Sequence, residues 1–277
     1  MPDLLLLNVD TTTSFKLEEL AKSKGFRVKL ALDFGTALEW LKVKEFDLVW
    51  AEIGTAVDKQ QKLADLLWKQ NPLAPFVIFD LSPEEESDHA RTARLFGAEV
   101  ARGESALSSL EKSLENIRPR GSLKSEKFKI MVVEDLDAPR DIICAYIESM
   151  GFSAVVGTSS AAEALTILES DPGGTSCIIT DIRMPQMTGD KFISMVRKHD
   201  KLRHLPIIVL TAYGTTDCLI DCLKAGASGF LVKPPKKHDL TRELARACRI
   251  ATQGANPRLA TEEEAELLRG TLLEQGL

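Results

Sequence analysis

The sequence predicts an α/β fold, a doubly wound parallel sheet with helices on both faces, and two observations lead to this prediction. Short apolar runs alternate with stretches of helical periodicity along the whole chain. The same rhythm is found once in each half of the chain. Because 277 residues suffice for two domains of ordinary size, each half can bury its own core.

The second half contains five short apolar runs, and each is followed by a helical stretch. Pro139 suits the first turn of a helix, because the N–H that proline lacks would have no partner there. The expected strands are Ile130–Val133, Ala154–Val156, Cys177–Thr180, Ile207–Leu210 and Phe230–Val232, with helices beginning near Pro139, Ser160, Gly189, Thr216 and Asp239.

The first half repeats this pattern with small local correspondences. Lys24-Gly25-Phe26 matches Met150-Gly151-Phe152, and Phe96-Gly97-Ala98 matches Ala225-Gly226-Ala227. A spacing of about 130 residues indicates a duplicated domain and not a solenoid. The expected strands are Leu4–Val9, Val28–Ala31, Leu48–Ala51, Phe76–Phe79 and a weaker Glu99–Ala101.

The predicted boundaries follow from composition. A stretch with Pro119, Gly121 and several charges is typical of a linker. The division is residues 1–117 for the first domain, 118–127 for the linker, 128–253 for the second domain and 254–277 for a C-terminal tail.

The tail contains a capping-box pattern, Thr261 with Glu264, ahead of a helix with several leucines. We expect a solvated, frayed terminal helix. The alternative is that Leu267, Leu268, Leu272 and Leu273 dock on a partner or join two copies as a homodimer.

Composition and charge exclude several classes of protein. The net charge of −6 gives no support for nucleic-acid binding. No apolar run approaches the roughly 20 residues needed to insert into a membrane, and the first residues lack the features of a signal peptide.

Five cysteines indicate reduced thiols and a cytoplasmic location. Cys218 and Cys222, one helical turn apart, could share a metal, but helix packing is the expectation.

Polar side chains follow four strands of the second half where each strand ends. Glu134 and Asp135 follow the first strand, and Asp181 follows the third. Thr211 and Lys233 follow the fourth and fifth. Because the carboxyl ends of parallel strands meet at one edge, these groups should share a pocket. Three crowded carboxylates favour a hard cation with oxygen ligands, such as Mg²⁺.

These residue types suit phosphoryl transfer to a carboxylate. Asp181 would attack phosphorus in line while Mg²⁺ shields the phosphoryl oxygens. Lys233 could pair with the carboxylate and then with a phosphoryl oxygen, and the Thr211 hydroxyl could hydrogen-bond another. No base is required, because aspartate side chains are ionised at neutral pH.

The whole second half resembles the receiver family of two-component response regulators, of which the chemotaxis receivers are an example. The resemblance rests on Val132-Val133-Glu134-Asp135 with Arg140, Thr180-Asp181-Ile182-Arg183-Met184-Pro185-Gln186-Met187-Thr188-Gly189, Leu210-Thr211-Ala212, Lys224-Ala225-Gly226-Ala227 and Phe230-Leu231-Val232-Lys233-Pro234.

The resemblance implies a flavodoxin-like (βα)5 fold with strand order 2-1-3-4-5. It also implies that Asp181 is the phosphoacceptor and that Mg²⁺ is bound by Glu134, Asp135, Asp181 and the backbone carbonyl of Arg183. Three further roles are implied: switch residues Thr211 and Phe230, rate-tuning residues Arg183 and Tyr213, and a cis bond before Pro234. Both rate-tuning side chains are large, so we expect slow dephosphorylation.

Two alternatives to this site remain. Asp, Thr and Pro also open loops after strands, but that does not explain why so many strand ends match one site. Haloacid dehalogenase-like phosphatases also phosphorylate an aspartate, yet they place it after the first strand with a second Asp two residues later. Here Asp181 follows the third strand and Arg183 occupies the second position.

The first half resembles a degenerate receiver, or pseudo-receiver. Glu52 stands at the phosphoacceptor position and Asp80 at the position of the switch threonine. Asn8 replaces the first acidic residue, and Arg102-Gly103 is the nearest substitute for Lys-Pro. We expect no phosphorylation here. Two minor alternatives are a mimic of the active state and a weak cation site formed by Asp10, Glu52 and Asp80.

The resemblance implies a signalling protein that catalyses only its own phosphorylation and dephosphorylation. Its phosphoryl donor would be a histidine kinase or phosphotransfer protein. Three outputs compete: phosphorylation-dependent contacts with a downstream protein effector, which we favour, a phosphate sink or phosphorelay intermediate, and DNA binding. The short tail and acidic balance argue against the last.

Overall fold

The structure is a computed structural model of the chain, which divides into two compact units, Met1–Gly121 and Ser122–Leu277. The predicted linker, Asn8, Tyr213 and four leucines of the tail (Leu267, Leu268, Leu272 and Leu273) lie outside the described residues. The structure describes residues 1–7, 10–71, 74–81, 93–94, 97–115, 117, 128–212, 216–253 and 257–266.

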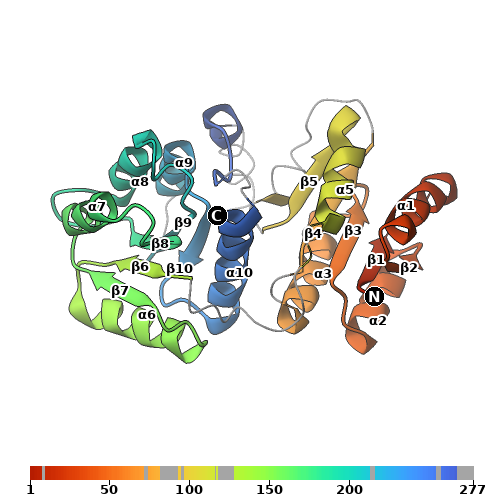
Figure 1. Cartoon of the computed structure of the whole chain (residues 1–277), viewed down its shortest axis with the longest axis horizontal. Coiled ribbons are helices and arrows are strands. Elements are labelled where there is room, and N and C mark those ends of the chain that lie inside the picture. Colours follow the sequence, from red (N-terminus) through yellow and green to blue (C-terminus); the bar gives the residue numbers. More distant parts are fainter. Residues whose placement is uncertain are drawn as a thin grey trace. The chain divides into compact units, whose positions relative to one another are not determined.

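The first unit is a parallel five-stranded sheet of order β2-β1-β3-β4-β5 (Figure 1). Its described elements are β1 Asp3–Leu7, α1 Thr11–Ser23, β2 Arg27–Ala31, α2 Phe34–Val43, β3 Leu48–Glu52, α3 Val57–Gln70, β4 Phe76–Asp80, β5 Glu99–Arg102, the 3₁₀ turn η1 Gly103–Ser105 and α5 Ala106–Glu115.

Strand β1 shows how this sheet buries both faces. Leu5 and Leu7 belong to the core cluster formed with α2 and α3, whereas Leu4 and Leu6 belong to the cluster formed with α1 and α5. All four are almost fully buried. Because alternate side chains of a strand point to opposite faces, a run of leucines is what a sheet with two covered faces requires.

The second unit has the same topology, with strand order β7-β6-β8-β9-β10 (Figure 1). Its elements are β6 Ile130–Val133, α6 Asp137–Ser149, β7 Val155–Thr158, α7 Ala161–Ser170, β8 Cys177–Asp181, α8 Gly189–Lys198, β9 Ile207–Thr211, α9 Thr216–Ala225, β10 Gly229–Val232 and α10 Lys237–Gln253.

The core of the second unit also lies on both sides of its sheet. Met131 and Val133 of β6 pack in one cluster with α7 and α8. Helix α6 contacts β6 and β7, and α10 contacts β8, β9 and β10. Ile130 and Val132, the alternate residues of β6, are buried as well.

The two predicted sheets and their common strand order are confirmed. Strand β7 begins one residue later and ends two residues later than expected, and α6 and α10 each begin two residues earlier. The duplication is also visible in backbone conformation, because Gly25 and Gly151 both end a helix with positive φ (83° and 96°). None of the described helices is long and apolar enough to cross a membrane.

The tail differs from the expected frayed helix over residues 257–266. The predicted capping box forms, since Thr261 N donates to Glu264 Oε2 (2.6 Å) and Glu264 N donates to Thr261 Oγ1 (3.2 Å). However, Leu259 and Ala265 are almost fully buried, and Leu259 N donates to the carbonyl of Ala227 (2.8 Å). This segment is therefore packed and hydrogen-bonded to the loop before β10.

Candidate functional site

The carboxyl ends of β6, β8, β9 and β10 meet as predicted, because the parallel register aligns them. Val133 of β6 pairs with Thr180 of β8, the residue before Asp181. Asp181 pairs with Leu210 of β9, and Thr211 pairs with Val232 of β10. Glu134 and Lys233 are the next residues after β6 and β10, so all these groups emerge at one edge of the sheet.

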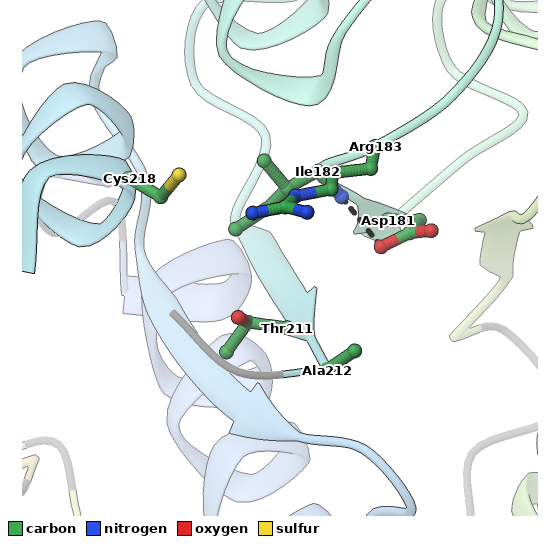
Figure 2. Close-up of a pocket in the computed structure, with 6 residues that line it drawn as sticks. All are labelled: Asp181, Ile182, Arg183, Thr211, Ala212 and Cys218. Atoms are coloured by element: carbon green, nitrogen blue, oxygen red, sulfur yellow. Dashed lines mark hydrogen bonds between the residues drawn. The ribbon is translucent and has the colours of Figure 1, made fainter. Parts of the chain in front are cut away.

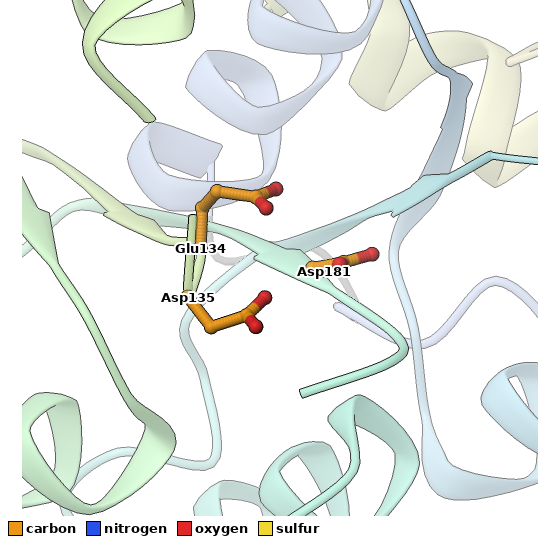
Figure 3. Close-up of side chains that lie close together, drawn as sticks. All are labelled: Glu134, Asp135 and Asp181. Carbon is orange, nitrogen blue, oxygen red and sulfur yellow. The ribbon is translucent and has the colours of Figure 1, made fainter. Parts of the chain in front are cut away.

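Three carboxylates converge at this edge (Figure 3). Oxygen atoms of Glu134, Asp135 and Asp181 all lie within 4.8 Å of one another. Glu134 is completely buried and Asp181 is buried, whereas Asp135 is partly exposed. The predicted carboxylate cluster is therefore present.

The ammonium of Lys233 joins two of these carboxylates. Its Nζ lies 2.5 Å from Glu134 Oε2 and 2.9 Å from Asp181 Oδ2. Burial, the largest single influence, disfavours the charged ammonium, but the hydrogen bonds and charges of Glu134 and Asp181 together outweigh it and raise the pKa of Lys233. The lysine is thus held protonated beside the predicted phosphoacceptor.

The donor set fits a hard divalent cation. Glu134 Oε1 is buried and has no hydrogen-bond partner among the described residues. With all three carboxylates charged, one ammonium leaves two negative charges uncompensated in a small, largely buried volume. An ion such as Mg²⁺, which prefers oxygen ligands, would offset this charge and use the free Glu134 oxygen.

The loop after Asp181 folds back tightly on the strand end. Ile182 N donates to Asp181 Oδ1 (2.7 Å), and Gly189 N donates to the carbonyl of Ile182 (2.8 Å). A Cβ at Gly189 would lie only 2.4 Å from the carbonyl oxygen of Asp181. Only glycine therefore permits this approach. The Ile182 N–H holds Oδ1 of Asp181, and Oδ2 lies beside Lys233.

A cavity of about 260 Å³ opens next to Asp181 (Figure 2). Thr211, about nine-tenths buried, lines it, and no described residue forms a hydrogen bond with its hydroxyl. Arg183 lines the cavity at its exposed side. Cys218 lines the cavity from the first turn of α9 and was not predicted as a site residue. The available signal in the sequence was its position at the start of the predicted helix, seven residues after Thr211.

The two α9 cysteines face different surroundings. Cys218 lines the cavity, whereas Cys222 is buried in the core, where burial raises the pKa of its thiol to about 12. Cys222 belongs to the core cluster of the second unit and Cys218 packs against it, as expected for helix packing.

The remaining predicted residues of this site have mixed outcomes. The bond between Lys233 and Pro234 is cis, as implied by the resemblance. Phe230 is half-buried and packs against the core beside Thr211's strand. Tyr213, the second predicted rate-tuning residue, lies outside the described part of the chain.

The first unit does not bring its three acidic candidates into a cluster. Asp10 is exposed and caps α1, accepting hydrogen bonds from the N–H groups of Thr12 (3.3 Å) and Thr13 (2.8 Å). Hydrogen bonds from Thr13 and Thr12 hold the pKa of Asp10 below its usual value. Among the described residues, Asp10, Glu52 and Asp80 form no metal-ligand group, contrary to the cation site considered above.

Asp80 is instead paired with Arg102. Arg102 Nε and Nη2 lie 3.2 and 3.1 Å from Asp80 Oδ2, with both side chains largely buried. Asp80 and Arg102 are cross-strand neighbours, as Thr211 and Val232 are in the second unit. Arg102, named above as part of the nearest substitute for Lys-Pro, therefore stands at the register position of Val232, one residue before that of Lys233.

Comparison with known proteins identifies the family. A family model described as a response regulator receiver domain matches residues 130–245. Chemotaxis protein CheY of Pseudomonas aeruginosa is 35% identical over 106 residues, which cover 38% of this chain and 84% of that protein. The chain belongs to the response regulator receiver family.

Other receiver proteins match the same region. Two-component response regulator ORR5 of Oryza sativa subsp. japonica is 31% identical over 132 residues, covering 48% of this chain and 97% of that protein. The solved structure of CheY4 from Vibrio cholerae covers 43% of this chain and 98% of its own, at 28% identity and a TM-score of 0.41. We call Ser122–Leu277 the receiver unit, because it contains the matched residues.

Proposed function

We propose that the receiver unit accepts a phosphoryl group on Asp181 in the presence of Mg²⁺. The observation that carries this proposal is the position of Lys233, whose Nζ contacts both Glu134 and Asp181 beside the three converging carboxylates. Glu134, Asp135, Asp181 and the backbone carbonyl of Arg183 would hold the ion. When bound, Mg²⁺ would neutralise charge on the phosphoryl oxygens.

The side chains of the site support an in-line displacement at phosphorus. An Asp181 carboxylate oxygen forms the new bond to phosphorus while the bond to the donor's nitrogen or oxygen breaks, and the leaving group keeps the electron pair. A histidine phosphorylated on a kinase or phosphotransfer protein is the proposed donor. Because Ile182 N holds Oδ1, the oxygen beside Lys233, Oδ2, is the proposed nucleophile.

Thr211 and Phe230 supply the proposed response to phosphorylation. The Thr211 hydroxyl lines the cavity without a hydrogen bond from any described residue, so it can turn toward a phosphoryl oxygen. Its strand pairs directly with β10, which carries Phe230. Movement of Thr211 would change how Phe230 packs and so alter the surface of α9, β10 and α10, where a protein effector would bind.

The favoured output is a phosphorylation-dependent protein contact, and a phosphate sink or phosphorelay is the alternative. A sink would transfer the phosphoryl group without changing the affinity of any effector. With either output, the protein would catalyse only its own phosphorylation and dephosphorylation. In the first unit, the Asp80–Arg102 pair and the Glu52 substitution support a unit that is not phosphorylated.

Labelling with acetyl phosphate tests this proposal. With Mg²⁺, wild type and Glu52→Gln should each gain one phosphoryl group by intact mass, whereas Asp181→Asn should gain none. Chelation with EDTA should abolish labelling of wild type and of Glu52→Gln. Label that survives Asp181→Asn, or that is lost in Glu52→Gln, would overturn the assignment of the site.

A further inference from the structure

Arg140, in the first turn of α6, contacts the loop that carries Glu134 and Asp135. Its Nη1 donates to the backbone carbonyl of Glu134 (2.8 Å), and its Nη2 pairs with the carboxylate of Asp137. A single planar guanidinium thus connects the end of β6 to the start of α6. Its charge is directed to the backbone and to Asp137, and no contact joins it to the three converging carboxylates.

This contact fixes the peptide plane that leads to Asp135. The Glu134 carbonyl and the Asp135 N–H belong to the same planar peptide group, so holding the carbonyl restricts the direction of the Asp135 side chain. Glu134 N is held too, because it donates to the carbonyl of Thr158 (3.1 Å). Both backbone polar groups of Glu134 are therefore fixed.

This restraint on the backbone of Glu134 matters because the carboxylates of the site repel one another. Three carboxylates with oxygens within 4.8 Å of one another favour any movement that separates them. Lys233 opposes that movement at Glu134 and Asp181, but it makes no contact with Asp135. The loop carrying Asp135 is restrained from the other side by Arg140.

Gly157 of β7 provides the space that Arg140 occupies. A Cβ built at Gly157 would lie 3.1 Å from Arg140 Cδ, 3.2 Å from Arg140 Cγ and 3.4 Å from Cys144 Sγ. Glycine inside a strand is unfavourable for the strand itself and often marks a close approach of another group. Here the approaching group is the stem of Arg140.

We propose that Arg140 is a positioning residue for the divalent-cation site, and that Gly157 is required because a larger residue would displace it. This inference rests on the proposed function, since it concerns the affinity of the cation site for Mg²⁺. Loss of the contact should weaken Mg²⁺ binding by roughly tenfold, as loss of groups that orient metal ligands commonly does.

Mg²⁺ titration calorimetry of the full chain without a phosphoryl donor distinguishes a positioning role of Arg140 from a purely electrostatic effect of its charge on Mg²⁺ binding. If the charge of Arg140 only repels the cation, Arg140→Gln should tighten Mg²⁺ binding and Arg140→Lys should leave it unchanged. Positioning predicts a higher Kd for both variants, because neither glutamine nor lysine reproduces the guanidinium fork. Arg203→Gln, which removes an exposed arginine from the loop before β9, is the charge-matched control and should retain wild-type affinity.

A double-mutant cycle tests the role of Gly157. Gly157→Ala should raise the Mg²⁺ Kd severalfold in the wild-type background and have little effect when Arg140 is already glutamine. Thermal unfolding in EDTA checks that the Arg140 variants are no less stable than Arg203→Gln. An undiminished Gly157→Ala effect without Arg140 would contradict the proposal.

The failure of this inference can be distinguished from failure of the proposed function. Absence of Mg²⁺ binding by the wild type would contradict both the proposed function and the positioning role of Arg140. Wild-type or tighter affinity in Arg140→Gln and Arg140→Lys, with normal Mg²⁺ binding by the wild type, would remove the positioning role of Arg140 alone.

Discussion

Gln186 has a strained backbone conformation in the loop that follows Asp181, the proposed phosphoacceptor. It lies between Asp181 and Gly189 and has a φ of 67°, which is unfavourable for residues other than glycine. The same loop is closed by Gly189 N, which donates to the carbonyl of Ile182.

Replacing Gln186 with glycine should stabilise the receiver unit. Gln186→Gly removes the steric conflict at positive φ but increases the entropy of the unfolded chain, so the expected gain in the free energy of unfolding is about 0.5–1 kcal/mol. Urea unfolding followed by circular dichroism measures it. Lys191→Gly, at an exposed helical position nearby, should instead lose about 1 kcal/mol. Equal losses in both variants would contradict the strain at Gln186.

At the scale of elements, the segment of residues 257–266 is part of the receiver unit's packing. Leu259 is buried and is hydrogen-bonded to Ala227, and Ser228 Oγ donates to the carbonyl of Pro257. Arg197, buried nearby, donates Nε to the carbonyl of Gly226 (2.8 Å), so α8 holds the same loop. Burial, reinforced by the charge of Arg258, lowers the pKa of Arg197 to about 9.

Variants in this segment should destabilise the receiver unit. Leu259→Ala should lower the free energy of unfolding by roughly 2–3 kcal/mol through lost burial, and Thr261→Ala by about 1 kcal/mol through loss of the helix cap. Urea unfolding followed by circular dichroism measures both. Glu262→Ala changes an exposed residue of the helix that follows Thr261 and should have almost no effect. If all three variants match wild type, the segment does not pack as described.

At the scale of the whole molecule, the two units can be observed separately. All three tryptophans lie in the first unit and both tyrosines in the receiver unit. Each unit has its own buried clusters, and the equivalent strands β1 and β6 contribute buried side chains to them. Tryptophan fluorescence therefore reports on the first unit, whereas circular dichroism reports on both.

Matched core variants should affect these signals differently. Leu6→Ala in β1 should lower the stability reported by tryptophan fluorescence by about 2–5 kcal/mol, because it leaves a cavity beside Trp50 in the same cluster. Val132→Ala in β6 should leave the tryptophan transition unchanged and lower only the transition seen by circular dichroism. Equal shifts of the tryptophan transition in both variants would show that the units unfold together.

The sequence alone was sufficient for the fold and most of the site. Apolar alternation located both sheets, and the duplication was evident from matching glycine positions such as Gly25 and Gly151. Glu134, Asp181 and Lys233 could be placed together because parallel strands bring their carboxyl ends to one edge. These features depend on local periodicity and strand order, which a sequence expresses directly.

Only the tertiary structure decided which polar groups pair. Register placed Arg102 opposite Asp80, local capping directed Asp10 to α1, and packing brought Cys218 to the cavity. Likewise, the approach of Arg140 to the Glu134 carbonyl depends on the space that Gly157, which has no side chain, leaves for the stem of Arg140. Such pairings depend on side-chain rotamers and on strand register to within one residue, and residue spacing along the chain does not contain that information.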